Sequence, residues 1–110
     1  DVERRFSKDD LLTTMTIYWM TQSYGTSARY YYECVHNPWR PAHDSMPVVE
    51  APTGIGVFLK EVLLMPRQWA ERYYNLRHWT VMNSGGHFAP MEEPEALVKD
   101  IRAFYRSLRS

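Results

Sequence analysis

The sequence predicts an α/β fold of which these 110 residues form one section. Two segments with strand character alternate with segments of helical periodicity, an order that favours parallel pairing of the strands. Two parallel strands do not make an independent sheet, because parallel sheets are covered by helices on both faces. The many apolar stripes beside so few strands therefore indicate the closing section of a larger α/β domain, and the length allows at most one domain.

The first expected element is a helix that starts near residue 7. Ser7 has the residue type of an N-cap, Asp10 stands at the capping-box position, and Phe6 with Leu11 can form a hydrophobic staple. Apolar residues then continue at helical spacing through Met15. We expect this helix to end before Ser23.

A second, tyrosine-rich helix is expected from Ser27 to about Val35, after Ser23-Tyr24-Gly25-Thr26 interrupts the first. The proline-punctuated stretch from Asn37 to Pro47 is expected to be a loop. Val48-Val49-Glu50-Ala51 then predicts a short strand, closed by a turn at Pro52-Thr53-Gly54-Ile55-Gly56.

Pro66 is placed to start a helix over residues 67–74, because proline is favoured at the first helical position. Trp79-Thr80-Val81-Met82 is the second expected strand and ends in Asn83-Ser84-Gly85-Gly86. The last helix is expected from about residue 92 to residue 108. Its apolar stripe consists of Leu97, Ile101, Phe104 and Leu108.

Composition excludes several classes of protein. The 13 basic and 13 acidic residues give a formal net charge of zero, so there is no electrostatic case for binding nucleic acid. The single Cys34 excludes an intrachain disulfide, and His36 and His43 lack a third ligand, so we expect no metal and no cofactor. Because no membrane-spanning run and no signal-peptide pattern are visible, we expect a cytoplasmic protein.

His87 follows the second expected strand, in Ser84-Gly85-Gly86-His87-Phe88. The two glycines let the backbone turn through conformations that other residues resist. A histidine just past a strand's carboxyl end lies where open α/β sheets bind ligands, and imidazole is suited to act as a general base near neutral pH. The local pattern alone leaves a surface histidine as an equal alternative.

A general-base histidine needs an acid that holds its ring in one tautomer. Glu61 follows the first strand region, 26 residues before His87, so neighbouring strand ends could bring the two together. From spacing alone, a solvated glutamate is the favoured alternative. Glu50 is a weaker candidate, because it lies inside the strand pattern.

Nearly the whole chain carries a further pattern, in the segments Phe6-Ser7-Lys8-Asp9-Asp10-Leu11-Leu12-Thr13 with Tyr18-Trp19, Arg29-Tyr30-Tyr31, Val49-Glu50-Ala51-Pro52-Thr53-Gly54, Glu61, Pro66-Arg67-Gln68-Trp69 and Gly85-Gly86-His87-Phe88-Ala89. In this order they resemble the C-terminal section of microsomal-type epoxide hydrolases, which are α/β-hydrolase-fold enzymes with a helical cap. The resemblance implies the end of the cap and a return loop in residues 1–46. It implies the last parallel strands and helices of the core in residues 47–110.

The resemblance also implies roles for three residues in converting an epoxide to a vicinal diol through an aspartyl ester. His87 matches the general base that activates water to hydrolyse the ester, and Glu61 matches the acid of the charge-relay triad. Tyr31 matches one of two cap tyrosines that donate a hydrogen bond or proton to the epoxide oxygen. The neighbours Tyr30 and Tyr32 leave a misalignment by one residue open.

The family's nucleophile and oxyanion hole lie upstream of this section, and no Gly-x-nucleophile-x-Gly pattern occurs in the chain. The implied partners are therefore an epoxide substrate and the upstream part of the same hydrolase, and the chain alone is expected to be inactive. An unpaired sheet edge makes a homo-oligomer a further expectation. Two alternatives remain open: another α/β-hydrolase, such as a dehalogenase or esterase, and a non-catalytic fragment or interaction module.

Overall fold

The structure, a computed structural model, describes residues 2–109. It divides into two compact units, and the boundary along the chain lies between Ala42 and His43. The boundary expected from the sequence, after residue 46, lies in the same proline-rich loop. Residues 1 and 110, at the outer ends of the two expected regions, lie outside the described residues. The assignment of these regions to a cap and a core stays a prediction.

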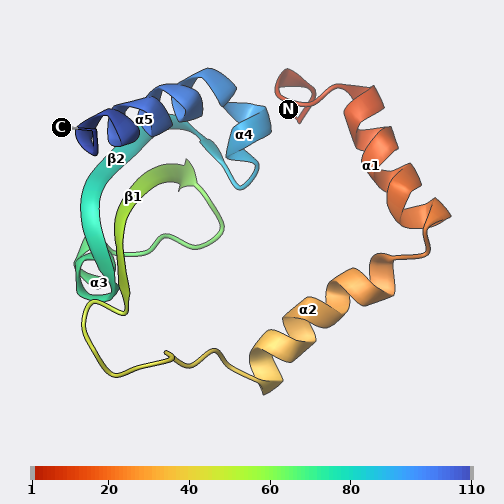
Figure 1. Cartoon of the computed structure of the whole chain (residues 1–110). Helices are drawn as coiled ribbons and strands as arrows, with labels where there is room; N and C mark the ends of the chain where they lie inside the picture. The colour runs from red at the N-terminus through yellow and green to blue at the C-terminus, as the bar shows by residue number, and fades with distance from the viewer. Residues whose placement is uncertain (1, 110) are drawn as a thin grey trace. The chain divides into compact units, whose positions relative to one another are not determined.

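The first unit is helical. It contains a short 3-10 helix (Val2–Arg4), α1 (Lys8–Met20) and α2 (Tyr24–His36) (Figure 1). The start of α1 confirms the expected capping box. The Ser7 hydroxyl accepts a hydrogen bond from the Asp10 backbone N–H at 3.1 Å, and the Asp10 carboxylate accepts one from the Ser7 N–H at 3.1 Å.

Helix α2 begins three residues earlier than expected, at Tyr24 instead of Ser27. The chain reverses within a shorter break, where Gln22 takes a left-handed backbone conformation with a φ of 52°. The Ser23 carbonyl already accepts a hydrogen bond from the Ser27 N–H at 2.9 Å. Glutamine rarely adopts this conformation, so the residue type at position 22 does not predict where the chain reverses.

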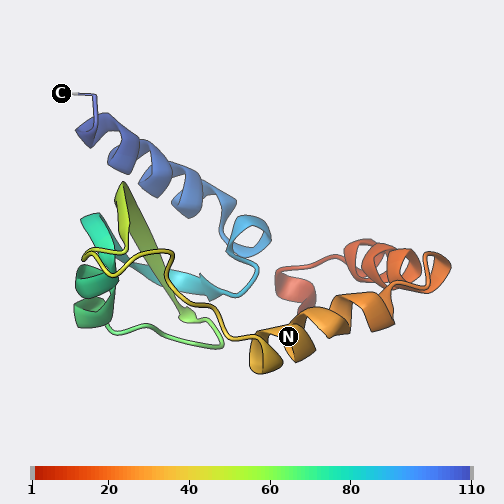
Figure 2. The ribbon, with the colours of Figure 1, turned by 60° about the horizontal axis from the view of Figure 1, so that its bottom comes forward.

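The second unit is a two-stranded sheet with helices around it. Strands β1 (Val49–Lys60) and β2 (Tyr74–Gly86) pair in parallel, as predicted, and α3 (Arg67–Tyr73) leads directly into β2. The short α4 (Ala89–Glu92) follows β2, and α5 (Pro94–Ser107) packs against both strands (Figures 1 and 2). This arrangement matches the C-terminal portion of an α/β-hydrolase fold.

The prediction of a turn at residues 52–56 is wrong, because β1 continues through these residues to Lys60. The glycines allow α5 and β2 to approach the strand closely. A Cβ atom on Gly54 would lie 2.9 Å from Cγ of Phe104, and one on Gly56 would lie 3.2 Å from Cε of Met82. Pro52 is tolerated because it lies at an irregularity in the ladder between Val49 and Pro52.

The last helix is divided instead of continuous. Glu93 adopts a non-helical conformation, with φ −140° and ψ 57°, which ends α4 and precedes α5. Proline disfavours the helical conformation in the residue before it, so Pro94 explains the break at Glu93. Strand β2 is also longer than expected at both ends, and His78 lies inside it, 2.7 Å from the Asp100 carboxylate of α5.

The core is small. Phe58, Met82 and Ala89 form a buried cluster against which Leu97 packs. The predicted stripe on α5 is confirmed only in part. Ile101 and Leu108 remain 44% and 42% exposed in the described chain. No helix among the described residues is both long and apolar enough to cross a membrane.

Candidate active site

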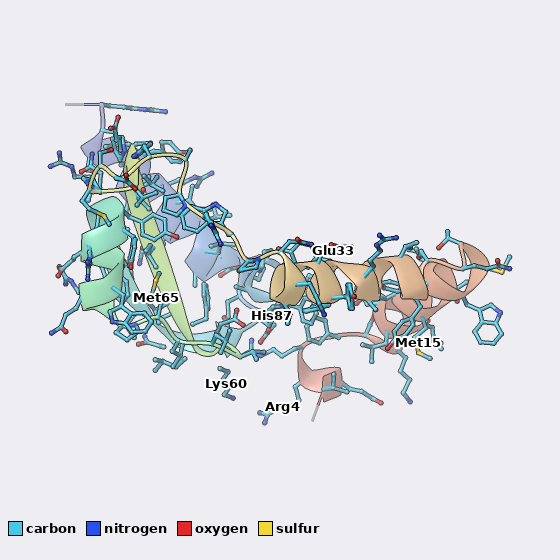
Figure 3. The ribbon with its side chains drawn as sticks, turned by 90° about the horizontal axis from the view of Figure 1, so that it is seen from below. Arg4, Met15, Glu33, Lys60, Met65 and His87 are labelled. Carbon is cyan, nitrogen blue, oxygen red and sulfur yellow. The ribbon has the colours of Figure 1, made fainter. Side chains whose placement is uncertain are left out.

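The candidate site lies where the parallel ladder ends. The last residue pair joins Lys60 of β1 to Gly86 of β2, and Glu61 and His87 are the residues that follow. Because parallel strands end at the same edge of a sheet, both side chains start from neighbouring backbone positions. Nδ1 of His87 lies 2.7 Å from Oε1 of Glu61 (Figure 3 labels His87 and Lys60). The structure therefore brings Glu61 and His87 together at neighbouring strand ends, as the order of elements allowed.

Two glycines make this approach sterically feasible. Gly85 has a φ of +98°, in the left-handed region that side chains other than glycine rarely adopt. A Cβ atom on Gly86 would lie 2.7 Å from the carbonyl oxygen of Lys60, which is too close for any other residue. The turn that brings His87 beside Glu61 thus depends on both glycines.

The hydrogen bonds to Glu61 determine the protonation of the pair. The contact with His87, and then the Val62 N–H at 2.7 Å from the same oxygen, lower the pKa of Glu61 below its ordinary value of 4.5. An ionised carboxylate only accepts hydrogen bonds, so Nδ1 of His87 carries the proton that is donated to it. In neutral imidazole this leaves Nε2 with a free lone pair, as a general base requires.

Both side chains of the pair remain accessible. The His87 side chain is 57% exposed and that of Glu61 is 32% exposed. The competing acid, Glu50, lies near the opposite end of β1, where its backbone carbonyl accepts a hydrogen bond from Asn75 at 2.8 Å. The geometry thus selects Glu61 over Glu50 as the partner of His87, while the catalytic roles of His87 and Glu61 stay predictions.

Tyr31 belongs to the first unit and is described within that unit only. It lies on α2, 72% exposed, with its ring edge-on to Tyr30 at a centroid distance of 5.8 Å. The pKa of Tyr30 is raised, mainly by a hydrogen bond with Cys34, which makes Tyr30 a poorer proton donor. The role of Tyr31 stays a prediction.

An open groove in the first unit includes Tyr31. It has a volume of about 1050 Å³ and runs between α1 and α2. Its lining is mostly aromatic and aliphatic, and comprises Thr14, Met15, Tyr18, Trp19, Gln22, Tyr24, Ser27, Ala28, Tyr30 and Tyr31. An apolar surface of this kind is typical of sites that take small apolar ligands.

Sequence reasoning missed the groups that surround the His87 loop. The Ser84 hydroxyl donates to Oε1 of Glu93 at 2.7 Å, and the Phe88 N–H donates to Oε1 of Glu92 at 2.9 Å. The adjacent glutamates before Pro94 were visible in the sequence, where they indicated only a helix start. Among the described residues, no group of three or more His, Cys, Asp or Glu side chains is arranged to hold a metal ion.

Comparison with known proteins yields a consistent set of relatives. No family model matches the chain. The chain is 40% identical over 104 residues to "Epoxide hydrolase 1" of Sus scrofa. The aligned region covers 94% of this chain and 23% of the relative. It is 33% identical over 111 residues to "Putative epoxide hydrolase" of Stigmatella aurantiaca, covering all of this chain and 24% of the relative.

A third relative, "Juvenile hormone epoxide hydrolase" of Manduca sexta, is 38% identical over 97 residues, or 86% of this chain and 21% of the relative. The chain therefore spans about a quarter of the length of the curated relatives that it matches. The matched part is their C-terminal part.

Proposed function

This chain corresponds in sequence to the C-terminal section of epoxide hydrolases, and we propose that it contributes the water-activating half of such an enzyme's active site. The observation that carries the proposal is the Glu61–His87 hydrogen bond at the shared end of two parallel strands. It fixes one ring nitrogen and leaves the other free for water. The similarity to named epoxide hydrolases supplies the class of reaction.

In the first step, an aspartate from an upstream part of the protein attacks a carbon of the epoxide. A carbon–oxygen bond of the ring breaks as the ester bond forms, and negative charge develops on the ring oxygen. Tyr31 donates its phenolic proton to that oxygen and so stabilises the transition state. The product of this step is a hydroxyalkyl ester of the enzyme.

In the second step, His87 removes a proton from water through Nε2 while the oxygen of that water attacks the ester carbonyl. The positive charge that forms on the imidazole is stabilised by the Glu61 carboxylate, 2.7 Å from Nδ1. The tetrahedral intermediate then expels the alkoxide, which takes the proton from the His87 imidazolium to give the diol. The second proton of the water leaves the released carboxyl group and restores the phenol of Tyr31. The enzyme carboxylate is regenerated with one oxygen from water.

Isotope labelling in a single turnover tests this two-step route. The longer protein that carries this section, in excess over styrene oxide, is allowed to react once in water enriched in ¹⁸O. The ester route predicts a first diol without ¹⁸O and an enzyme that has gained the label in its nucleophilic aspartate. A first diol that carries ¹⁸O would contradict the ester, and hydrolysis of alkyl halides or carboxylic esters without diol formation would contradict the class of reaction.

A further inference from the structure

The loop that carries His87 is held at both ends by two adjacent glutamates. Glu93 accepts a hydrogen bond from the Ser84 hydroxyl at 2.7 Å, at the start of the loop. Glu92 accepts one from the Phe88 backbone N–H at 2.9 Å, at the end of the loop. The backbone between these two contacts contains only Gly85, Gly86 and His87.

Glu93 also fills the space beside Gly85. A Cβ atom on Gly85 would lie 2.8 Å from Cγ of Glu93 and 2.7 Å from Cδ1 of Phe58. The left-handed turn at Gly85 is therefore enclosed between a core phenylalanine and the glutamate that binds Ser84. This contact is half-buried, so water competes with it less than at a fully exposed site.

Glu92 acts on the other side of His87. The N–H that it binds belongs to the peptide group that joins His87 to Phe88, so the hydrogen bond restrains the backbone directly after the histidine. The imidazole itself is more than half exposed, and the Phe88 ring that it touches edge-on is 57% exposed. Within the described chain, packing therefore contributes little to the direction of the ring, which depends on the Glu61 hydrogen bond and on the backbone of the loop.

We propose that Glu92 and the Ser84–Glu93 pair are positioning residues, which hold the His87 loop so that Nδ1 faces Glu61 and Nε2 faces the site of water attack. This inference rests on the proposed function for its catalytic consequence. Pro94 contributes to this arrangement. It disfavours the helical conformation at Glu93, and the resulting break between α4 and α5 lets two adjacent side chains reach opposite ends of one loop.

Separate measurement of the two half-reactions distinguishes positioning from a structural role. In the longer protein, Glu92→Ala and Ser84→Ala are expected to slow ester hydrolysis roughly ten- to hundredfold, the loss typical of a displaced catalytic group. Ester formation should change less than twofold, because His87 does not act in that step. Glu92→Gln, which keeps an oxygen acceptor for the Phe88 N–H, should retain most of the hydrolysis rate.

Glu95→Ala is the matched control, since Glu95 is exposed on α5 and forms no hydrogen bond to residues 84–88 within the described chain. Rapid-quench mass spectrometry gives both rates, and thermal unfolding identifies variants that fail to fold. Equal slowing of both half-reactions in the well-folded Glu92→Ala and Ser84→Ala variants would overturn the proposal. If Glu92→Ala does not fold, the comparison on Ser84→Ala decides, and if Ser84→Ala does not fold, the comparison on Glu92→Ala decides.

A second measurement needs no epoxide. In ¹⁵N spectra of the histidine ring, Nδ1 of His87 should carry the proton in the unaltered protein, and this preference should weaken in Glu92→Ala and Ser84→Ala but not in Glu95→Ala. A shift in these spectra from a protein without epoxide hydrolase activity would support positioning and refute the proposed function. Unchanged spectra and unchanged hydrolysis in an active enzyme would refute positioning alone.

Discussion

His87 leaves its Nε2 atom free because Glu61 occupies its Nδ1 atom at 2.7 Å. The carboxylate has no proton to share, so the direction of the hydrogen bond is fixed and with it the tautomer. The Val62 N–H contributes a second hydrogen bond to the same oxygen of Glu61. The Glu61 carboxylate and the Val62 N–H thus determine which ring nitrogen of His87 is left to accept a proton.

Titration tests this arrangement at the level of Glu61. We expect its pKa to lie below 4.5 in the folded protein and to rise towards 4.5 in His87→Gln, with the Val62 hydrogen bond retained. Because the folded-state pKa is lowered, the contact stabilises the protein above the ordinary pKa of glutamate. That contribution is lost as pH falls through the lower, folded-state value. Carbon-13 NMR of the carboxyl group measures both pKa values, and identical titration in the two proteins would refute the contact.

The three consecutive tyrosines of α2 permit a controlled test of Tyr31. We expect Tyr31→Phe in the longer protein to slow ester formation by about one to three orders of magnitude, because removal of a donor to a developing oxyanion costs rates of this size. Tyr30→Phe and Tyr32→Phe are the controls, each one position away on the same helix. A larger loss in either control than in Tyr31→Phe would transfer the role to that residue.

Among the helices and strands, the features that could be predicted from the sequence depend on residues close together in the chain. The capping box at Ser7 and Asp10, the helix after Pro66 and the parallel order of the strands follow from residue types and short spacings, and the structure contains all three. The continuation of β1 through Gly54 was not predictable from local sequence. Gly54 serves the approach of Phe104, about fifty residues later in the chain, and Gly56 serves the approach of Met82 in the neighbouring strand.

The candidate site likewise has features that could be predicted from the sequence and features that could not. That Glu61 and His87 follow neighbouring strands could be inferred from the order of elements, and their contact then follows from parallel pairing. The contributions of Glu92 and Glu93 could not, because they depend on how the chain turns from the end of β2 into α4.

Gly86 offers a test of the end of the ladder. We expect Gly86→Ala to destabilise the protein by about 1–3 kcal/mol or more, because its Cβ would lie 2.7 Å from the Lys60 carbonyl oxygen, a backbone atom that cannot move without disturbing the strand pair. Gly25→Ala is the control, since nothing lies within 4 Å of a Cβ at that helical position and alanine favours helices by about 1 kcal/mol. Denaturant unfolding compares them, and equal stabilities would contradict the close approach.

At the scale of the whole molecule, much apolar surface remains uncovered. Trp19 is 83% exposed and Leu63 is 85% exposed, and within the described chain β1 has a paired neighbour on one side only. Monomeric soluble proteins rarely expose apolar surface on this scale. These faces fit a section whose remaining contacts come from the other three quarters of a protein as long as its relatives.

The isolated 110-residue chain is therefore expected to self-associate or to be poorly soluble. Light scattering and calorimetry on the purified chain measure this directly. A monodisperse 13.1 kDa monomer that unfolds cooperatively would contradict the expectation and support a self-standing interaction module.

Trapping the enzyme-bound ester is a direct test of whether His87 activates the water that hydrolyses it. The longer protein with His87→Gln is mixed with styrene oxide, and its intact mass is compared with that of the unaltered protein, with His78→Gln as a histidine control away from the site. We expect that His87→Gln alone gains the mass of one epoxide stably and stops forming diol, because ester formation does not need the base. A folded His87→Gln protein that forms no adduct, or that still releases diol at the unaltered rate, would show that His87 does not activate this water.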